Sequence, residues 1–290
     1  MCLKANRLEC LLLAAACTGL VASGQPVPPG AAALGYTNCV INDTPTVAEI
    51  APGRNGNYKW FLGNWWQSPA PSITNFSTVS NALTLNFAGA SLDLQDTPID
   101  FSAGALPVLI GSNGFYVEFD VQLSDNNQDH WACGWVQSRQ LGTGQDSYSP
   151  PDPVGFVRWM EFDIQESGWD TGLTGTIHNW TGTNAGNVTS ISNPNSENPT
   201  PLDMSKKHTF GGSYDPIHQQ VAWWVDGVLQ MSAGSPYVPA IGAQQQFFLI
   251  LSAYSHGLNL SYTMYVSGVR AYIPSGGLAP PTDLRIVPQK

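Results

Sequence analysis

The segment RWMEFDIQES (Arg158–Ser167) carries three carboxylates within six positions, in a chain that is only 11% charged. Successive side chains of a β-strand point to opposite faces, so Glu161 and Asp163 would share one face of this strand. The other face is apolar and suits a protein core: Met160, Phe162 and Ile164. Strict alternation would also place Glu166 on that apolar face, where an ionised carboxylate is costly. The segment therefore predicts a core strand whose regular pattern is interrupted before Glu166.

A one-residue β-bulge near Ile164–Gln165 would return Glu166 to the face of Glu161 and Asp163, beside Trp159. The two glutamates would then be about 13 Å apart at Cα, so their carboxyl groups could approach the ~5–5.5 Å separation of a retaining glycosidase. Three neighbouring acids cannot all ionise cheaply, so one proton should be held to a higher pH than normal. A glycosidase needs one ionised nucleophile and one protonated acid, and this crowding supplies both. The alternatives for such a cluster are a solvated strand face or a calcium site.

Short alternating segments, separated by Gly, Pro, Asn and Asp, fill the chain from Asn81 onward. Each has the two-residue period of a strand, and Asp226–Gly227 is a hairpin turn between two of them. Besides the acidic strand, the segments are ALTLNFAG (82–89), GFYVEFDVQLS (114–124), HWACGWVQS (130–138), TGTIHNW (174–180), HTFGGSYD (208–215), VAWWVDGVLQM (221–231), FFLILSAY (247–254) and YTMYVSGVRAYI (262–273). The pattern predicts an all-β fold, a single antiparallel β-sandwich or β-jelly roll.

The first 24 residues have the pattern of a secretory signal peptide. Lys4 and Arg7 precede an apolar run from about Cys10 to Ala22, which is too short to span a membrane. We therefore expect a secreted protein, with a signal peptide at 1–24, a β-jelly-roll domain at 25–275 and a Pro/Gly-rich C-terminal tail at 276–290. The 29 Gly and 22 Pro suit an extracellular all-β protein with many turns.

The chain is acidic, with a formal net charge of −10. Such a surface repels nucleic acid and acidic polysaccharides, so a neutral polysaccharide is the favoured partner. Because there is neither a basic run nor a further apolar run of about 20 residues, we expect no nucleic-acid binding and no membrane insertion. The protein is expected to be a monomer. Cys39 and Cys133 follow the signal peptide, and they either pair as a disulfide or remain one buried and one exposed thiol.

Several segments together resemble glycoside hydrolase family 16, the laminarinase-like β-glucanases on a concanavalin A-like jelly roll. EFDIQE has the family's bulged E-x-D-x-x-E spacing, and HWACGW resembles its W-P-A-x-W segment. GTIHNW is similar to the strand on which the family places a His near the acids. VAWWVDGVLQ resembles the family's Asp-Gly hairpin, and VSGVRAYI resembles its closing strand. The resemblance covers residues 81–273 well and 36–80 loosely.

This resemblance implies a role for each acid. Glu161 would be the nucleophile, Glu166 the acid/base, and Asp163 the residue that holds the nucleophile's carboxylate. His178 would lie close to Glu166 or to the sugar. The chain departs from the family in having Met160 where a Gly usually precedes the first Glu, and SAYSHGLN (252–259) in place of N-x-A-x-G-G. These departures affect the shape of the cleft and the choice of substrate, and leave the three acids unchanged.

Aromatic side chains are expected along the substrate cleft. The resemblance places Trp131 and Trp135 on its glycone side, where indole rings suit the apolar faces of sugars. From the residues alone, both would be interpreted as core tryptophans, and His178 as a buried structural histidine. Trp159 lies beside the acids, and Asn64 in LGNWWQS is expected at the cleft edge.

The expected function is that of a secreted retaining endo-glycosidase acting on internal β-glucosidic bonds, with β-1,3(4)-glucan as the favoured substrate. A non-catalytic carbohydrate-binding lectin on the same fold is an open alternative, as is a transglycosylase or galactan hydrolase of the same family. No P-loop, dinucleotide motif or zinc-ligand spacing occurs, so no cofactor and no metal is expected. A structural calcium ion stays an open alternative without a clear motif.

Overall fold

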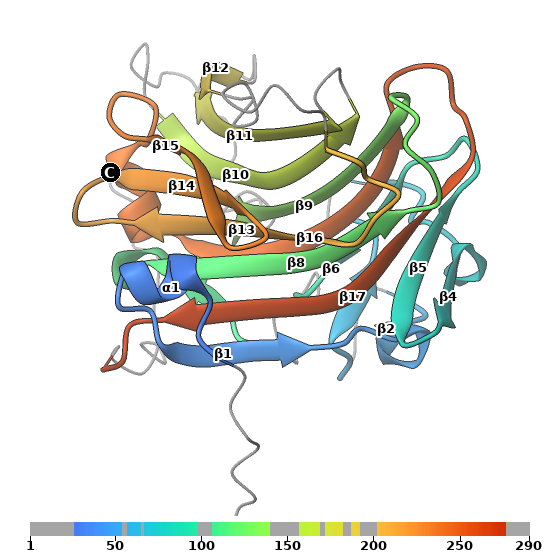
Figure 1. Cartoon of the computed structure of the whole chain (residues 1–290), viewed down its shortest axis with the longest axis horizontal. Coiled ribbons are helices and arrows are strands. Elements are labelled where there is room, and N and C mark those ends of the chain that lie inside the picture. The colour runs from blue at the N-terminus through green and yellow to red at the C-terminus, as the bar shows by residue number, and fades with distance from the viewer. Residues whose placement is uncertain are drawn as a thin grey trace, which may run out of the picture.

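The computed structural model describes residues 26–53, 57–64, 67–97, 106–139, 157–168, 172–181, 187–191 and 202–276. In this part of the chain two β-sheets form curved layers with little helix (Figure 1), which confirms the predicted all-β sandwich. The predicted signal peptide and nearly all of the predicted tail lie outside the described residues. Among the described helices, none has the length and apolar character needed to cross a membrane.

The first sheet has eight strands and is antiparallel throughout. Its order is β15 (Val228–Ala233), β14 (Gln220–Val225), β13 (His208–Asp215), β8 (Phe115–Leu123), β17 (Tyr262–Ile273), β5 (Ala82–Phe87) and β4 (Phe76–Val79), with β1 (Asn38–Asp43) also paired to β17. The predicted hairpin turn at Asp226–Gly227 joins β14 to β15 and is confirmed, with both residues at positive φ.

The second sheet has nine strands and carries the acidic segment. Its order is β12 (Asn187–Ile191), β11 (Gly172–Thr181), β10 (Val157–Gly168), β9 (His130–Ser138), β16 (Gln246–Ser255), β6 (Leu92–Gln95), β3 (Trp60–Leu62) and β2 (Ile50–Ala51), with β7 (Leu109–Ile110) paired to β16. Only β2 and β3 are parallel among these described pairs. The short helices are α1 (Pro29–Ala33), η1 (Val47–Glu49), η2 (Ile73–Asn75), η3 (Gly111–Asn113) and η5 (Ala240–Gln244).

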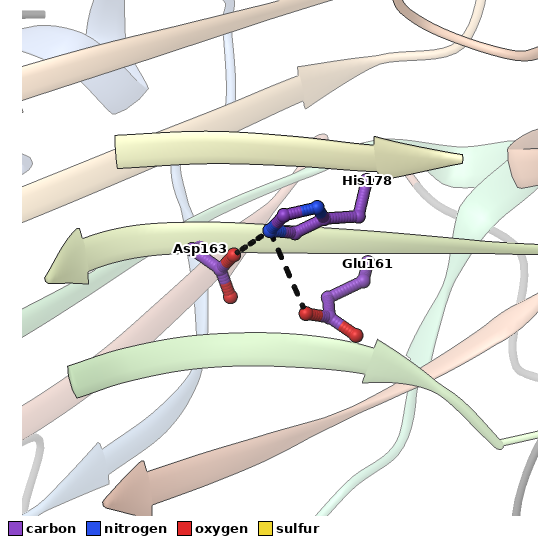
Figure 2. A group of neighbouring side chains, drawn as sticks. All are labelled: Glu161, Asp163 and His178. Atoms are coloured by element: carbon purple, nitrogen blue, oxygen red, sulfur yellow. Dashed lines mark ion pairs between the residues drawn. The ribbon is translucent and has the colours of Figure 1, made fainter. Parts of the chain in front are cut away.

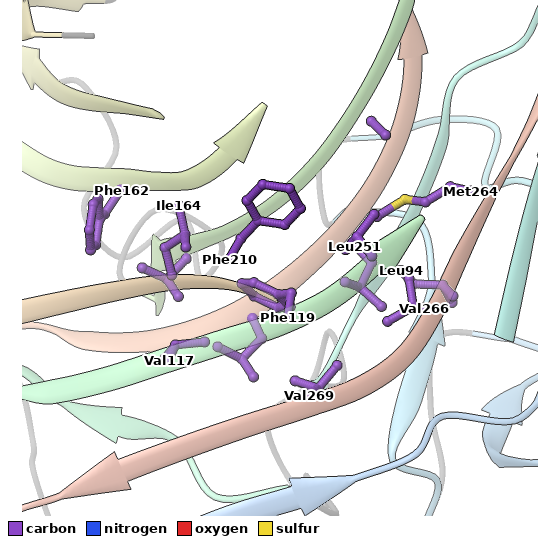
Figure 3. Packing of buried hydrophobic residues seen from close by; sticks show 14 of the residues in the cluster. Leu94, Val117, Phe119, Phe162, Ile164, Phe210, Leu251, Met264, Val266 and Val269 are labelled. Carbon is purple, nitrogen blue, oxygen red and sulfur yellow. The ribbon is translucent and has the colours of Figure 1, made fainter. Parts of the chain in front are cut away.

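The main hydrophobic core lies between the two sheets (Figure 3). Alternate side chains of each strand enter it, as period-2 sequences predict. From the acidic strand β10 these are Met160, Phe162 and Ile164, each at most 2% exposed. Burying each such side chain stabilises the fold by about 1.5–3 kcal/mol. This packing fixes which face of β10 is inward, and so it directs Glu161 and Asp163 to the opposite face of the sheet.

The two cysteines of the described residues are free thiols. Cys39 is exposed on β1, whereas Cys133 is buried on β9 in the other sheet. Of the two alternatives for this pair, the structure shows one buried and one exposed thiol.

Candidate active site

The strand β10 has one residue more than its neighbours between Asp163 and Glu166. On β11, Asp163 pairs with Thr176 and Glu166 pairs with Thr174, so two residues of β10 stand opposite Gly175 alone. Those two residues are Ile164 and Gln165. The predicted β-bulge is therefore confirmed at its predicted position, and Glu166 returns to the face of Asp163.

Core and backbone contacts hold the bulge in place. The Ile164 side chain lies in the core against Gly212 of β13, where a Cβ would come within 2.5 Å of Ile164 Cγ1. The Gln165 amide donates to the carbonyl of Ala132 on β9 at 2.8 Å. Ile164 thus stays inward, as predicted, and Gln165 is the residue at which the alternation of side chains along β10 shifts by one position.

A tryptophan from the opposite sheet fixes the backbone at the start of the bulge. The buried Trp223 of β14 donates its indole N–H to the carbonyl of Asp163 at 2.8 Å. It reaches this carbonyl because Gly175 has no side chain, since a Cβ there would lie 2.2 Å from Trp223 Nε1. The core side of the sandwich therefore sets the backbone that carries Asp163.

Glu161 is held by two donors from the strands on either side of it. Gln137 Nε2 on β9 and Trp180 Nε1 on β11 both donate to Glu161 Oε2, at 2.5 and 2.8 Å. The side chain is 13% exposed, so little water reaches the carboxyl group. Both N–H groups are donors only and cannot accept a hydrogen bond from a protonated Glu161, so they favour Oε2 as an unprotonated acceptor.

Glu166 has a different set of partners. Trp131 Nε1 donates to its Oε1 at 3.0 Å, and the Thr176 hydroxyl donates to its Oε2 at 2.7 Å. A hydroxyl can rotate and accept instead, so Thr176 can also receive a hydrogen bond from a protonated Glu166. The two glutamates therefore differ in a chemically useful way, because only Glu166 has a partner suited to both of its protonation states.

Asp163 lies between the glutamates along β10 and contacts His178 of β11 (Figure 2). His178 Nε2 is 3.0 Å from Asp163 Oδ2 and 4.0 Å from Glu161 Oε1. Burial lowers the pKa of His178, but the hydrogen bond to Asp163 and the charges of all three acids outweigh burial and raise it to about 9. At neutral pH the imidazole is therefore a cation that offsets part of the negative charge around it.

The crowding of the acids changes their protonation. Burial, and then the charge of Asp163, raise the pKa of both Glu161 and Glu166 above its usual value. Trp180, Trp131 and Thr176 oppose this shift by hydrogen bonding, and His178 opposes it by its charge. As the sequence predicts, the site holds protons to a higher pH than isolated glutamates do, and this crowding keeps the glutamates from ionising together at neutral pH.

Three of these residues also have the geometry of metal ligands. One ligand atom each from Glu161, Asp163 and His178 lies within 4.8 Å of the others, the only such group among the described residues. A metal ion bound here would have to displace the proton that the three acids hold on His178, so metal affinity would rise with pH.

The structure places the predicted cleft tryptophans Trp131 and Trp135 on the same face of β9 as Gln137. Trp135 is 7% exposed and donates its indole N–H to Ser252 on β16 at 2.9 Å. Trp131, besides binding Glu166, stacks against His256 with ring centroids 4.9 Å apart. Trp131 is thus a direct neighbour of the acids, and sugar contact by either ring stays a prediction.

The other two predicted substrate contacts are more deeply buried. Trp159 shares the strand face of Glu161 and is 3% exposed, while Asn64 follows β3 and is 1% exposed. Neither amide atom of Asn64 has a hydrogen-bond partner within the part of the chain that the structure describes. A role in substrate binding for both residues stays a prediction.

Four residues of the site are absent from the sequence-based prediction: Gln137, Thr176, Trp180 and His256. Alternation could have found the first three, because each lies two positions from a predicted residue on the same strand face. Gln137 follows Trp135, and Thr176 and Trp180 flank His178. His256 lies after β16 in SAYSHGLN, where no periodic pattern shows what it contacts.

No protein-family model and no curated protein matches the chain by sequence. Solved structures match it by fold, among them an endo-1,3-β-glucanase from Streptomyces sioyaensis, with 18% identity and a TM-score of 0.56 over 86% of this chain and 99% of that chain. Another is SCLam, a non-specific endo-β-1,3(4)-glucanase from family GH16, with 16% identity and a TM-score of 0.53 over 82% and 91%. A third comes from work on endo-acting O-glycanases of the human gut microbiota that initiate mucin breakdown, with 14% identity and a TM-score of 0.56 over 81% and 99%. The chain therefore has the β-jelly-roll fold of glycoside hydrolase family 16 structures, as its sequence resemblance predicts.

Proposed function

We propose that this protein is a retaining endo-glycosidase that hydrolyses internal β-glucosidic bonds, with Glu161 as nucleophile and Glu166 as acid/base. The observation that carries the proposal is the bulge, which brings both glutamates to one face of β10 with Asp163 between them. The fold shared with endo-β-glucanases supports the same assignment.

The reaction would proceed by two displacements. Glu161 attacks the anomeric carbon while Glu166 gives its proton to the departing glycosidic oxygen, which yields a covalent glycosyl-enzyme. The ionised Glu166 then takes a proton from water, and the resulting hydroxide equivalent releases the sugar from Glu161. Both carboxyl groups return to their starting protonation states, so the cycle is balanced.

Hydrogen-bond partners favour this order of roles over its reverse. Glu161 Oε2 accepts from two obligate donors, and these stabilise the anion that a nucleophile requires. Glu166 faces Thr176, whose hydroxyl can serve both the protonated acid and the ionised base. Asp163 holds the cationic His178 beside Glu161, which further favours an ionised nucleophile.

A neutral β-glucan is the substrate class that we propose. The acidic chain would repel acidic polysaccharides. Two of the structures with the same fold are described as β-1,3- and β-1,3(4)-glucanases, which makes β-1,3(4)-glucan the first candidate. The third is connected with mucin O-glycans, so these belong in the substrate panel with galactans. We also propose that the protein is secreted and acts as a monomer without a cofactor.

The test is a reducing-end assay on this panel with the wild-type protein and Glu161→Gln. We expect new reducing ends from a β-glucan with the wild type, and none with the variant, which should still bind the glycan. A Glu161→Gln variant with wild-type turnover would exclude the assignment. Binding by the wild type without any new reducing ends would instead favour a lectin.

A further inference from the structure

A buried carboxylate outside the acidic strand organises the same face of the sheet. Asp93 on β6 is 2% exposed, and its Oδ1 accepts hydrogen bonds from Ser252 Oγ at 2.6 Å and from the Tyr254 hydroxyl. Both donors come from the adjacent strand β16. Sequence alternation places Asp93 on the face opposite Leu92 and Leu94, which fill the core.

The first hydroxyl connects Asp93 to Trp135. Ser252 has a single hydroxyl proton, and it points to Asp93. Its oxygen is then free to accept the indole N–H of Trp135 at 2.9 Å. Two consecutive hydrogen bonds thus run from Trp135 to Ser252 and from Ser252 to Asp93. Asp93 sets their direction, and with it the orientation of the Trp135 ring.

The second hydroxyl connects Asp93 to Glu166. The Tyr254 ring packs edge-on against Trp131, with centroids 5.5 Å apart and planes at 60°. Trp131 in turn donates its indole N–H to Glu166 Oε1 at 3.0 Å. Burial, and then the charge of Asp93, raise the pKa of Tyr254 well above its usual value, so this hydroxyl keeps its proton.

The strand register shows that Asp93 cannot act on the sugar bond directly. Glu166, Cys133, Ser252 and Asp93 lie in one row across four strands. Adjacent strands are about 4.8 Å apart, so Asp93 is roughly 14 Å from Glu166 at Cα. Its influence must pass through the side chains between them.

We propose that Asp93 is a positioning residue that orients both cleft tryptophans, and through Trp131 the carboxyl group of Glu166. Its kinetic consequences rest on the proposed glycosidase function. Its effect on the two indole groups does not, which allows the two claims to be tested apart.

A kinetic test separates the connection through Tyr254 from the connection through Ser252. Tyr254→Phe keeps the ring but loses the hydroxyl that binds Asp93, so we expect kcat to fall about tenfold with KM nearly unchanged, since only the geometry of Glu166 is disturbed. Ser252→Ala removes the acceptor of the Trp135 indole N–H, so we expect KM to rise by about tenfold with kcat nearly unchanged. Asp93→Asn should show both changes.

A second buried carboxylate provides the matched control. Asp43 on β1 is 3% exposed and accepts the indole N–H of the core tryptophan Trp60 at 2.8 Å. Asp43→Asn should lower the melting temperature about as much as Asp93→Asn does, but keep wild-type kcat and KM. Equal kinetic effects of both variants would reduce Asp93 to an ordinary structural residue and overturn the proposal.

The readout that needs no activity is the indole N–H spectrum in two-dimensional ¹H–¹⁵N NMR. The Trp131 and Trp135 signals are assigned from Trp131→Phe and Trp135→Phe. We expect Asp93→Asn to shift both signals, Tyr254→Phe to shift that of Trp131 alone, and Asp43→Asn to shift neither. If folded Asp93→Asn leaves both signals in place, the proposal is wrong. If that variant does not fold, the signals of Tyr254→Phe and Ser252→Ala decide the question.

The two claims can fail separately. If the wild-type protein cleaves no glycan but the variants show these shifts, the proposed function is wrong and the positioning role of Asp93 is still supported.

Discussion

The Thr176 hydroxyl lies 2.7 Å from Oε2 of Glu166, on the strand that pairs with the bulge. Its hydrogen bond stabilises the ionised carboxylate and so lowers the pKa of Glu166 against the larger upward effect of burial. Thr176→Val removes this bond, and the pKa of Glu166 should rise. Because the general acid must be protonated, the alkaline limb of the kcat/KM profile should move to higher pH while the maximum rate falls. Thr176→Ser keeps the hydroxyl and should retain the wild-type profile. An unmoved alkaline limb in Thr176→Val would contradict the role of Glu166 as acid.

His178 should control the opposite limb. Its positive charge lowers the pKa of Glu161, which must be ionised to attack. His178→Gln removes that charge, so the pKa of Glu161 should rise and the acidic limb of the pH profile should move to higher pH. The alkaline limb should move in the same direction by less, because the His178 charge is a lesser cause of the pKa of Glu166. The measurement is kcat/KM across pH 4 to 9. His208 is paired with Asp226 in the other sheet, and His208→Gln is the control that should leave the profile unchanged.

The raised pKa values also predict how stability depends on pH. An unfolded glutamate loses its proton near pH 4.5, whereas burial and mutual repulsion raise the pKa of both Glu161 and Glu166 in the folded protein, so the pair holds a proton to higher pH. Above pH 4.5 the folded state therefore binds more protons than the unfolded state, and the free energy of unfolding falls as pH rises. Glu161→Gln removes one of these groups and should be more stable than the wild type at pH 8, on the order of 2 kcal/mol, with little difference at pH 4.5. Urea unfolding at both pH values measures this, and a constant difference would argue against burial of an ionisable Glu161.

The sequence was sufficient to predict the bulge, because leaving Glu166 in phase with Phe162 and Ile164 would bury a charge among core side chains. The partners of each glutamate could not be predicted in the same way. Gln137 and Trp180 meet at Glu161 only because β9 and β11 pair with β10 in a particular register, and long-range pairing sets that register. Asp93 is further removed, since its link to the site passes through two side chains of β16. Local alternation thus predicts which face a residue occupies, and tertiary pairing decides what it meets there.

The close fit around the bulge predicts a sensitive glycine. Gly175→Ala would place a methyl group against Trp223, which must then release the carbonyl of Asp163. We expect a loss of about 1–3 kcal/mol in stability together with a loss of activity. Gly234→Ala is the matched control, because the nearest atom to a Cβ there is the Gln219 carbonyl oxygen at 3.7 Å. Wild-type activity in a destabilised Gly175→Ala variant would show that the Trp223 contact supports the fold but not the site.

The mechanism is tested most directly by trapping the covalent intermediate. A 2-deoxy-2-fluoro β-glucan oligosaccharide with a good leaving group slows both displacements, so the glycosyl-enzyme accumulates and can be located by peptide mass spectrometry. The account predicts one glycosyl group per chain, attached to Glu161, and its absence in Glu161→Gln. A sugar attached to Glu166, or hydrolysis that inverts the anomeric centre without any adduct, would contradict it.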